Sequence, residues 1–191
     1  MLVDYLIALG AEVAVKRNDA LTAGEAVESG ADGLLISPGP GTPEQAGISV
    51  DLARTCIAKK HPLLGVCLGH QAIALACGST VERTWPVHGK VASIRHDGSG
   101  LFEGLPSPFA AIGYHSLAVP DPQPPLIANA WSDDGTVMAM RHAAAPVHGI
   151  QFHPESVASE QGKAILSKFL ETCHAHLDER PFVSYTFTIR S

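Results

Sequence analysis

The sequence predicts an α/β fold with a mostly parallel central sheet flanked by helices and additional antiparallel strands in the second half. Short apolar runs alternate with helical patterns in the first half, as in successive β–α–β units. The runs at 33–37 and 62–66 lack polar alternation, which is typical of strands buried on both faces of a parallel sheet. In the second half, short runs are separated by Gly, Pro and Asp turns, which favours antiparallel strands.

The helices of the first half are predicted from apolar periodicity and from glycines that end them, such as Gly10, Gly30 and Gly78. We expect helices at 2–9, 23–29, 50–59 and 68–76, and strands at 12–15, 33–37 and 62–66. In the second half we expect strands at 90–94, 110–112, 126–131, 137–141 and 147–152, followed by a helix at 162–174.

Length and composition indicate one folded domain. The 191 residues suit a single domain, and 46% hydrophobic with 17% charged residues excludes a disordered chain. We assign residues 1–176 to this domain and 177–191 to a C-terminal extension. Apolar side chains alternate with polar ones over 183–190, which is a strand pattern. That strand could complete the sheet, lead into a fused domain, or have no structural role.

Charge and cysteine spacing exclude several classes of protein. A net charge of -6 argues against binding nucleic acid through its phosphates. No apolar run approaches the roughly 20 residues of a membrane span, and residues 1–9 carry Asp4 without a basic region, unlike a signal peptide. The cysteines fit neither a metal site nor a disulfide framework: Cys56, Cys67, Cys77 and Cys173. We therefore expect a cytoplasmic protein without a metal, membrane or nucleic-acid partner.

The strongest local signal is the segment from Gly65 to Gln71. An apolar strand stops at Cys67 and a helix begins at once, as in a nucleophile elbow. Gly65 and Gly69 remove side chains that would clash in so tight a bend. The helix N-terminus favours a thiolate, and the N–H of Leu68 points where an oxyanion would form. A lone Cys would more often be a core residue, but this context favours a nucleophile.

A candidate base ends the last apolar run. His153 and Glu155 lie two residues apart, so both project from the same side of an extended segment. A cysteine nucleophile needs a base that takes and returns a proton, and a third group that orients the base. By itself this pair would be a surface His with a solvated Glu, and it gains meaning only beside Cys67.

Two further segments suit a small ligand. The loop at 37–43 follows a buried strand, and its Gly39 and Gly41, beside Pro40, allow close approach of a ligand to the backbone. No Gly-Lys-Ser/Thr follows, so this is not a phosphate loop. At 114–117, Ser116 and Leu117 belong to a polar interruption that could hold a small amino acid. A plain turn is the alternative for both segments.

Together these segments resemble the class I (triad) glutamine amidotransferases, especially the small subunits of aminodeoxychorismate synthase and anthranilate synthase. The resemblance implies a flavodoxin-like fold over 1–176. It extends from about residue 2 to residue 170, and its motifs are 16–19, 37–43, 46–49, 65–72, 88–90, 114–117, 149–155 and 159–162. Residues 16–19 and 114–117 favour the aminodeoxychorismate member.

The resemblance implies a role for each residue. Cys67 would attack the side-chain amide of L-glutamine, and the N–H groups of Leu68 and Gly39 would hold the oxyanion. His153, oriented by Glu155, would transfer protons. The remaining substrate-site positions are Pro40, Gly41, Gln71, Ser116 and Leu117. Ammonia would pass to a chorismate-binding synthase subunit or fused domain, which needs magnesium, while this subunit needs no cofactor.

Other functions remain open from the sequence. An anthranilate synthase component II of the tryptophan pathway is the alternative to the para-aminobenzoate (folate) pathway. A stand-alone cysteine hydrolase and a truncated, catalytically weak docking module are the others. The last is suggested because relatives begin with an apolar strand, whereas this chain opens at the following helix. We expect the missing strand to expose apolar surface at a cost of several kcal/mol, and a wrongly placed start or a fragment is the leading hypothesis for its absence.

Overall fold

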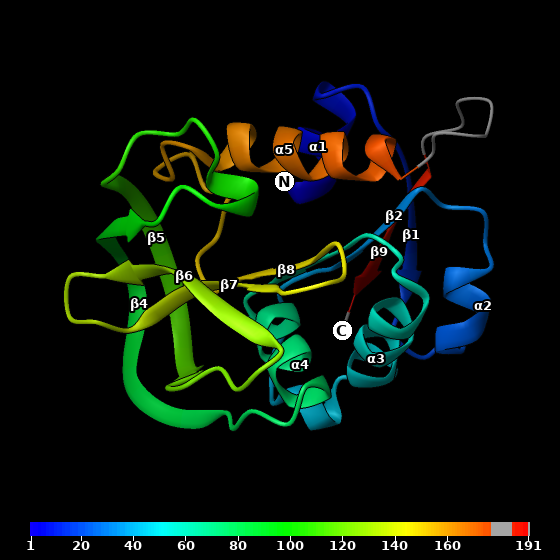
Figure 1. Ribbon diagram of the computed structural model, residues 1–191, viewed down its shortest axis with the longest axis horizontal. Helices are drawn as coiled ribbons and strands as arrows, with labels where there is room; N and C mark the ends of the chain where they lie inside the picture. The colour runs from blue at the N-terminus through cyan, green and yellow to red at the C-terminus, as the bar shows by residue number, and fades with distance from the viewer. Residues whose placement is uncertain (177–184, 191) are drawn as a thin grey trace.

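The computed structural model describes residues 1–176 and 185–190, which form one nine-stranded sheet of order β1-β9-β2-β3-β8-β7-β6-β4-β5 (Figure 1). The first five strands in this order are parallel: β1 (Glu12–Arg17), β9 (Tyr185–Arg190), β2 (Gly33–Ile36), β3 (Leu63–Val66) and β8 (Val147–Ile150). The others are antiparallel: β7 (Val137–His142), β6 (Leu126–Ser132), β4 (Glu82–His96) and β5 (Phe109–Ala118). The predicted α/β class, with antiparallel strands in the second half, is confirmed.

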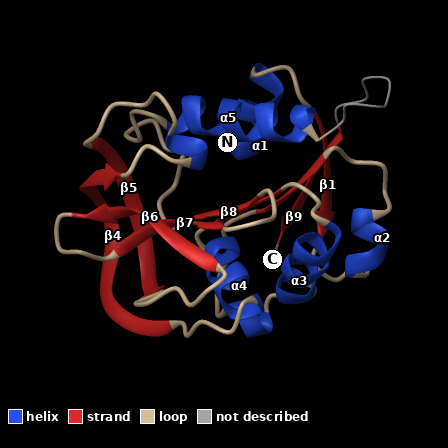
Figure 2. Ribbon diagram, in the orientation of Figure 1, coloured by secondary structure: helices blue, strands red, loops and turns tan. Residues whose placement is uncertain are grey.

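Helices cover both faces of the parallel part of the sheet (Figure 2). On one face lie α1 (Leu2–Ala8) and α5 (Gly162–Ala175); on the other lie α2 (Ala23–Val27), α3 (Ser49–Lys59) and α4 (Leu68–Ala76). Two short 3-10 helices complete the order: η1 (Pro43–Gln45) and η2 (Gly100–Phe102). No helix within the described ranges is long and apolar enough to cross a membrane.

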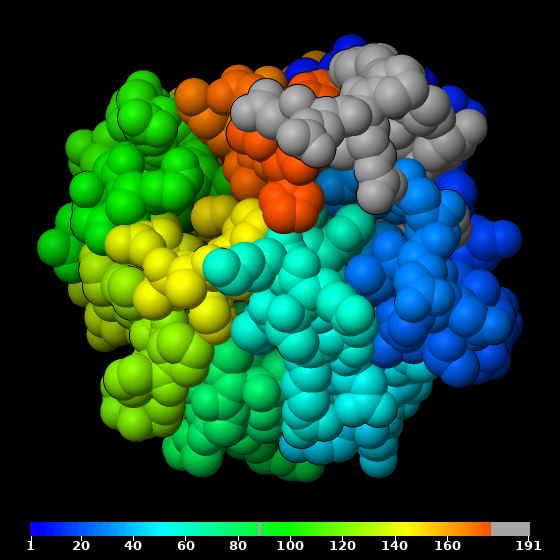
Figure 3. Space-filling view, turned by 45° about the vertical axis from the view of Figure 1, so that its right-hand side comes forward, coloured from blue at the N-terminus to red at the C-terminus, as the bar shows by residue number. Residues whose placement is uncertain are grey.

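The continuous apolar runs are buried on both faces of the sheet, as predicted. In β2, Leu35 packs in the core under α1 and α5, whereas Leu34 and Ile36 pack in the core under α3 and α4. Alternate residues of a strand point to opposite faces, so a strand covered by helices on both sides must be apolar throughout. Figure 3 shows the chain near residue 60 (cyan) beside the chain near residue 145 (yellow), where Leu63 N donates to Pro146 O at 3.0 Å.

The strand position that the sequence led us to expect empty is filled by the C-terminal segment. β9 lies between β1 and β2 and runs parallel to both, with Phe187 opposite Ala14 on one side and Leu34 on the other. A strand that led into α1 through a right-handed β–α–β unit would take this place beside β1. Of the three roles left open for the tail, the structure shows completion of the sheet, so this place leaves no apolar surface exposed, contrary to our expectation. Part of the predicted 183–190 strand, and the rest of the 177–191 extension, lies outside the described residues.

In the second half, β4 and β5 are longer than the strands predicted there. β4 begins at Glu82 rather than at residue 90, and its register with β5 shifts between Arg83 and Val87. The segment 114–117, for which a turn was an open alternative, is strand, because His115 and Leu117 pair with Val87 and Arg83. Pairing over about thirty residues of separation overrides the local pattern.

Candidate active site

Cys67 lies in the sharp turn between β3 and α4, as predicted. Its φ of 53° and ψ of -97° are rare for a residue with a side chain, and such strain is typical of functional sites. The turn is held at both ends, because Cys67 N donates to Ile150 O at 2.8 Å and Gln71 N donates to Cys67 O at 3.2 Å. The strand–turn–helix geometry is that of a nucleophile elbow.

The glycines on either side of the turn are required by close backbone contacts. A Cβ on Gly65 would lie 2.4 Å from the carbonyl of Gly69, and a Cβ on Gly69 would lie 2.5 Å from Ile36 O. Both distances are shorter than any real Cβ contact. The elbow can therefore pack against β2 only because these two positions carry no side chain, which confirms the reason given for them from sequence.

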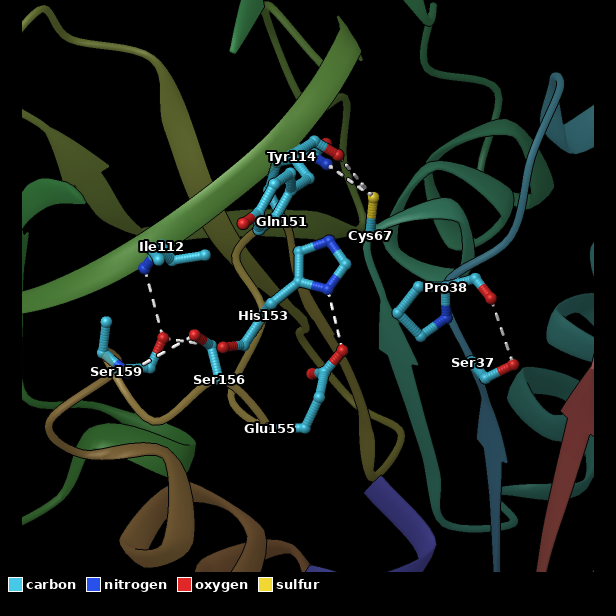
Figure 4. Close-up of polar contacts among 11 residues, drawn as sticks. Ser37, Pro38, Cys67, Ile112, Tyr114, Gln151, His153, Glu155, Ser156 and Ser159 are labelled. Atoms are coloured by element: carbon cyan, nitrogen blue, oxygen red, sulfur yellow. Dashed lines mark hydrogen bonds and ion pairs between the residues drawn. The ribbon is translucent and has the colours of Figure 1, made fainter. Parts of the chain in front are cut away.

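His153 and Glu155 follow β8 and form a partly buried pair (Figure 4). His153 Nδ1 lies 2.8 Å from Glu155 Oε1, and both side chains are 14% exposed. The backbone of this segment is anchored to β5, because His153 N donates to Ile112 O at 2.9 Å and Ile112 N donates to Ser159 Oγ at 3.1 Å. The ring of Tyr114 packs edge-on against the imidazole, with 5.5 Å between ring centroids. The imidazole is thus held in place by the Glu155 carboxylate, by its anchored backbone and by the ring of Tyr114.

The electrostatic surroundings of His153 favour its charged form. Burial alone would lower its pKa, but hydrogen bonding and charge interactions with Cys67 and Glu155 outweigh burial and raise the pKa to about 9. Nε2 faces Cys67 in Figure 4, although no hydrogen bond of ordinary geometry joins it to another described residue. An imidazolium held between a carboxylate and a thiol can stabilise a thiolate and donate a proton.

A chain of hydrogen bonds surrounds the sulfur of Cys67, which is 8% exposed. Cys67 Sγ donates to Tyr114 O at 3.6 Å and accepts from Gln151 Nε2 at 3.6 Å. Gln71 Nε2 donates to Gln151 Oε1 at 3.2 Å and to Leu117 O at 3.3 Å. Gln71 is therefore joined to Cys67 through Gln151, and Leu117 is joined to Gln71. Gln151 was missed from sequence, although a polar residue inside an otherwise apolar run was a usable signal.

The glycine loop lies at the same edge of the sheet as Cys67. It continues from β2, whose partner β3 leads into the elbow. Gly39 is half-buried, whereas Pro40 and Gly41 are exposed. Ser116 is also exposed, on β5. The part that these residues take in binding, and the donor roles of Gly39 and Leu68, stay predictions.

Within residues 1–176 and 185–190, no three His, Cys, Asp or Glu side chains gather so that they could hold a metal ion. The described cysteines are all unpaired thiols. Burial raises the pKa of Cys56 and of Cys173 to about 12 and also raises that of Cys77. Burial therefore disfavours the thiolate form of these three side chains.

Comparison with known proteins agrees with this geometry. The family model of class-I glutamine amidotransferases matches residues 1–173. Anthranilate synthase component 2 of Thermus thermophilus is 53% identical over 175 residues, covering 89% of this chain and 85% of the relative. Aminodeoxychorismate synthase component 2 of Escherichia coli is 48% identical over 172 residues, covering 88% and 91%.

Two other similarities are informative. Aminodeoxychorismate/anthranilate synthase component 2 of Bacillus subtilis is 47% identical over 174 residues, covering 90% of this chain and 89% of the relative. The solved structure of a protein assigned to GMP synthase from Thermoplasma acidophilum superposes with a TM-score of 0.79 at 24% identity, covering 91% of this chain and 86% of that one. This structural similarity supports the fold alone.

Proposed function

The chain belongs to the class-I glutamine amidotransferases, and we propose that it hydrolyses L-glutamine with a Cys67–His153–Glu155 triad and delivers ammonia to a chorismate-binding synthase. The observation that carries this proposal is the strained elbow that presents Cys67 to an imidazole whose other nitrogen lies 2.8 Å from the partly buried Glu155 carboxylate. Nucleophile, base and orienting group thus come together from β3 and from the segment after β8.

The triad would act in two steps. The Cys67 thiolate adds to the side-chain amide carbon of glutamine, and the N–H groups of Leu68 and Gly39 hold the oxyanion. The tetrahedral intermediate collapses as His153 donates a proton to the departing nitrogen. The C–N bond breaks, the nitrogen leaves as ammonia, and the glutamyl group remains on Cys67 as a thioester. His153 then takes a proton from water, which attacks the thioester and releases glutamate. A pKa near 9 keeps His153 protonated at neutral pH, ready for the first transfer.

The substrate would lie over the hydrogen-bonded chain beside Cys67. Gln71 and Leu117, with Ser116, would bind the amino-acid end of glutamine, while Pro40 and Gly41 would close the opposite side. Gln71 is 3% exposed and already fixed by two acceptors, so its position needs no rearrangement on binding.

The partner would dock on the β4–β5 side of the site. Trp85 is 90% exposed in the irregular part of β4 opposite residues 115–117, and Val91 and Tyr114 are about half exposed. A cavity of about 630 Å³ opens there, with Trp85, Val91 and His115 in its lining. Exposed apolar side chains gathered beside a cavity are typical of an interface. The named relatives are components of chorismate-utilising synthases, so we assign this face to such a synthase.

For the acceptor we propose aminodeoxychorismate synthesis in the folate pathway, supported by the segments 16–19 and 114–117. Anthranilate synthesis in the tryptophan pathway is the second candidate, favoured by the 53% identity to the Thermus component. Magnesium would be bound by the partner, and this subunit would need no cofactor. The unpaired thiols suit a reducing compartment, so we also propose a cytoplasmic location.

The test combines the purified chain with a chorismate-aminating partner and measures glutamate release from glutamine, with Cys67→Ser as control. Release that depends on the partner and disappears in Cys67→Ser would support the proposal, because a serine hydroxyl is a far weaker nucleophile at neutral pH. The aminated product would identify the pathway. A folded chain that releases no glutamate with either kind of partner would instead support a docking module, and release that the partner does not stimulate would support a stand-alone hydrolase.

A further inference from the structure

The carboxamide of Gln151 links the nucleophile to the substrate site. Gln151 follows β8, and its backbone N donates to Met138 O at 2.9 Å. Its side chain is fully buried, with Nε2 3.6 Å from Cys67 Sγ and Oε1 3.2 Å from Gln71 Nε2. Both ends of the carboxamide are therefore used, one on the sulfur and the other on a residue expected to bind glutamine.

The hydrogen-bond directions fix which end of Gln151 faces the sulfur. Gln71 places an N–H against Gln151 Oε1, and its other bond to Leu117 O holds that N–H in place. A carboxamide has one acceptor and one donor end, so the donor end of Gln151 must then face Cys67. A buried donor that finds no partner is costly, which keeps Nε2 on the sulfur.

The two contacts of the sulfur favour opposite protonation states. Tyr114 O can only accept, so its contact at 3.6 Å requires a proton on the sulfur. Gln151 Nε2 can only donate, so its contact becomes stronger when the sulfur is negative. Once the thiol proton has left, the uncharged carboxamide of Gln151 still donates a hydrogen bond to the sulfur. The carbonyl oxygen of Tyr114 then repels the negatively charged sulfur.

We propose that Gln151 is a positioning residue that holds the Cys67 thiolate and the Gln71 carboxamide in one hydrogen-bonded array. This inference rests on the proposed role of Cys67 as the nucleophile. Gln151 does not contact the amide bond that is broken; it acts through Cys67 and Gln71. Its loss should therefore alter both the ionisation behaviour of Cys67 and the use of glutamine.

The experiment measures the rate at which iodoacetamide alkylates Cys67, mapped by peptide mass spectrometry, from mildly acidic to mildly alkaline pH. Gln151→Met keeps the length of the side chain and removes both polar groups. Gln151→Glu keeps the acceptor for Gln71 and removes the donor to the sulfur. Gln123→Met is the matched control, because Gln123 is exposed and, within the described part of the chain, its side chain bonds only to Asp121.

We expect the midpoint of the alkylation curve to move up by about one pH unit in Gln151→Met and at least as far in Gln151→Glu, since a hydrogen bond to a charged group is lost. Glutaminase kcat/KM should fall about 10-fold or more in both variants. Gln123→Met should behave as wild type. Thermal unfolding shows which variants remain folded. If Gln151→Met does not fold, the alkylation curve of Gln151→Glu provides the test.

A Gln151 variant that unfolds at lower temperature but keeps the wild-type alkylation curve would overturn the proposal and leave a purely structural role. The curve reports on Cys67 without any turnover. A wild-type protein that lacks glutaminase activity but shows the expected displacement in its Gln151 variants would therefore refute the proposed function and still support the role of Gln151.

Discussion

Replacing Glu155 by Gln tests the electrostatics of the site most directly. The variant keeps the size of the side chain and removes the charge from an ion pair of 2.8 Å whose members are 14% exposed. The pKa of His153 is raised from 6.5 to about 9 by Cys67 and Glu155 against burial. That difference corresponds to roughly 3 kcal/mol, shared between the two partners. Losing the Glu155 share should lower the pKa of His153 by about one unit or more.

The same change has a defined effect on stability. The folded-state pKa of His153 is raised, so its contribution to stability is fully present below 6.5 and is lost as pH rises through about 9. Urea unfolding should therefore show wild type more stable than Glu155→Gln by about 1 to 2 kcal/mol near pH 6. The difference should shrink above pH 9.

The rate of glutamate release should depend on how Glu155 orients and charges His153. Glutamate release by Glu155→Gln should fall about 10- to 100-fold at neutral pH, because a charge-assisted hydrogen bond that orients the base is lost. Glu171→Gln is the control, since Glu171 is exposed on α5 and, among the described residues, pairs only with Lys168. A Glu155→Gln protein with wild-type rates and a wild-type pH profile would refute the assignment of Glu155 as the group that orients His153.

Three further changes test the elbow, the C-terminal strand and the docking face. Gly69→Ala should destabilise by about 2 to 4 kcal/mol in urea unfolding, because its Cβ would lie 2.5 Å from Ile36 O, whereas Gly24→Ala in α2 meets nothing and should stabilise slightly. Thr188→Pro removes an N–H from a strand paired on both sides and should lower stability by about 3 kcal/mol; an unchanged protein would mean that β9 does not pair there. Trp85→Ser should weaken partner binding in titration calorimetry and leave partner-free glutamate release unchanged.

Local patterns were sufficient for the buried strands of the parallel sheet and for naming Cys67, His153 and Glu155 as candidate site residues. Burial on both faces forces uninterrupted apolar runs such as β2 and β3, and a strand-to-helix turn leaves its signature within the few residues around Cys67. The sequence paired His153 with Glu155 as residues on one side of an extended segment; they do pair, but across a turn in which Ser156 N donates to His153 O at 3.2 Å. Each of these inferences needed only neighbours in sequence, or the meeting of carboxyl strand ends at one edge of a sheet.

Contacts between distant segments could not be predicted. The paired strand at 114–117 depends on the irregular stretch of β4 near Val87, which no local pattern in either segment reveals. The alternation at 183–190 predicted a strand but not its partners, which are β1 and β2. Gln151 gives the same lesson, because its contact with Cys67 joins residues 84 positions apart.

The short segment that ends β8 supplies most of what surrounds the nucleophile. Ile150 O accepts the N–H of Cys67 at 2.8 Å, the next residue places a donor on the sulfur, and His153 follows with its carboxylate partner. Neighbouring strand residues point to opposite faces, so a slip of one residue in the β3–β8 register would withdraw the Gln151 side chain from Cys67. The apolar pairing of Val66 with Ile150 fixes that register, and through it the hydrophobic core determines where the triad can form.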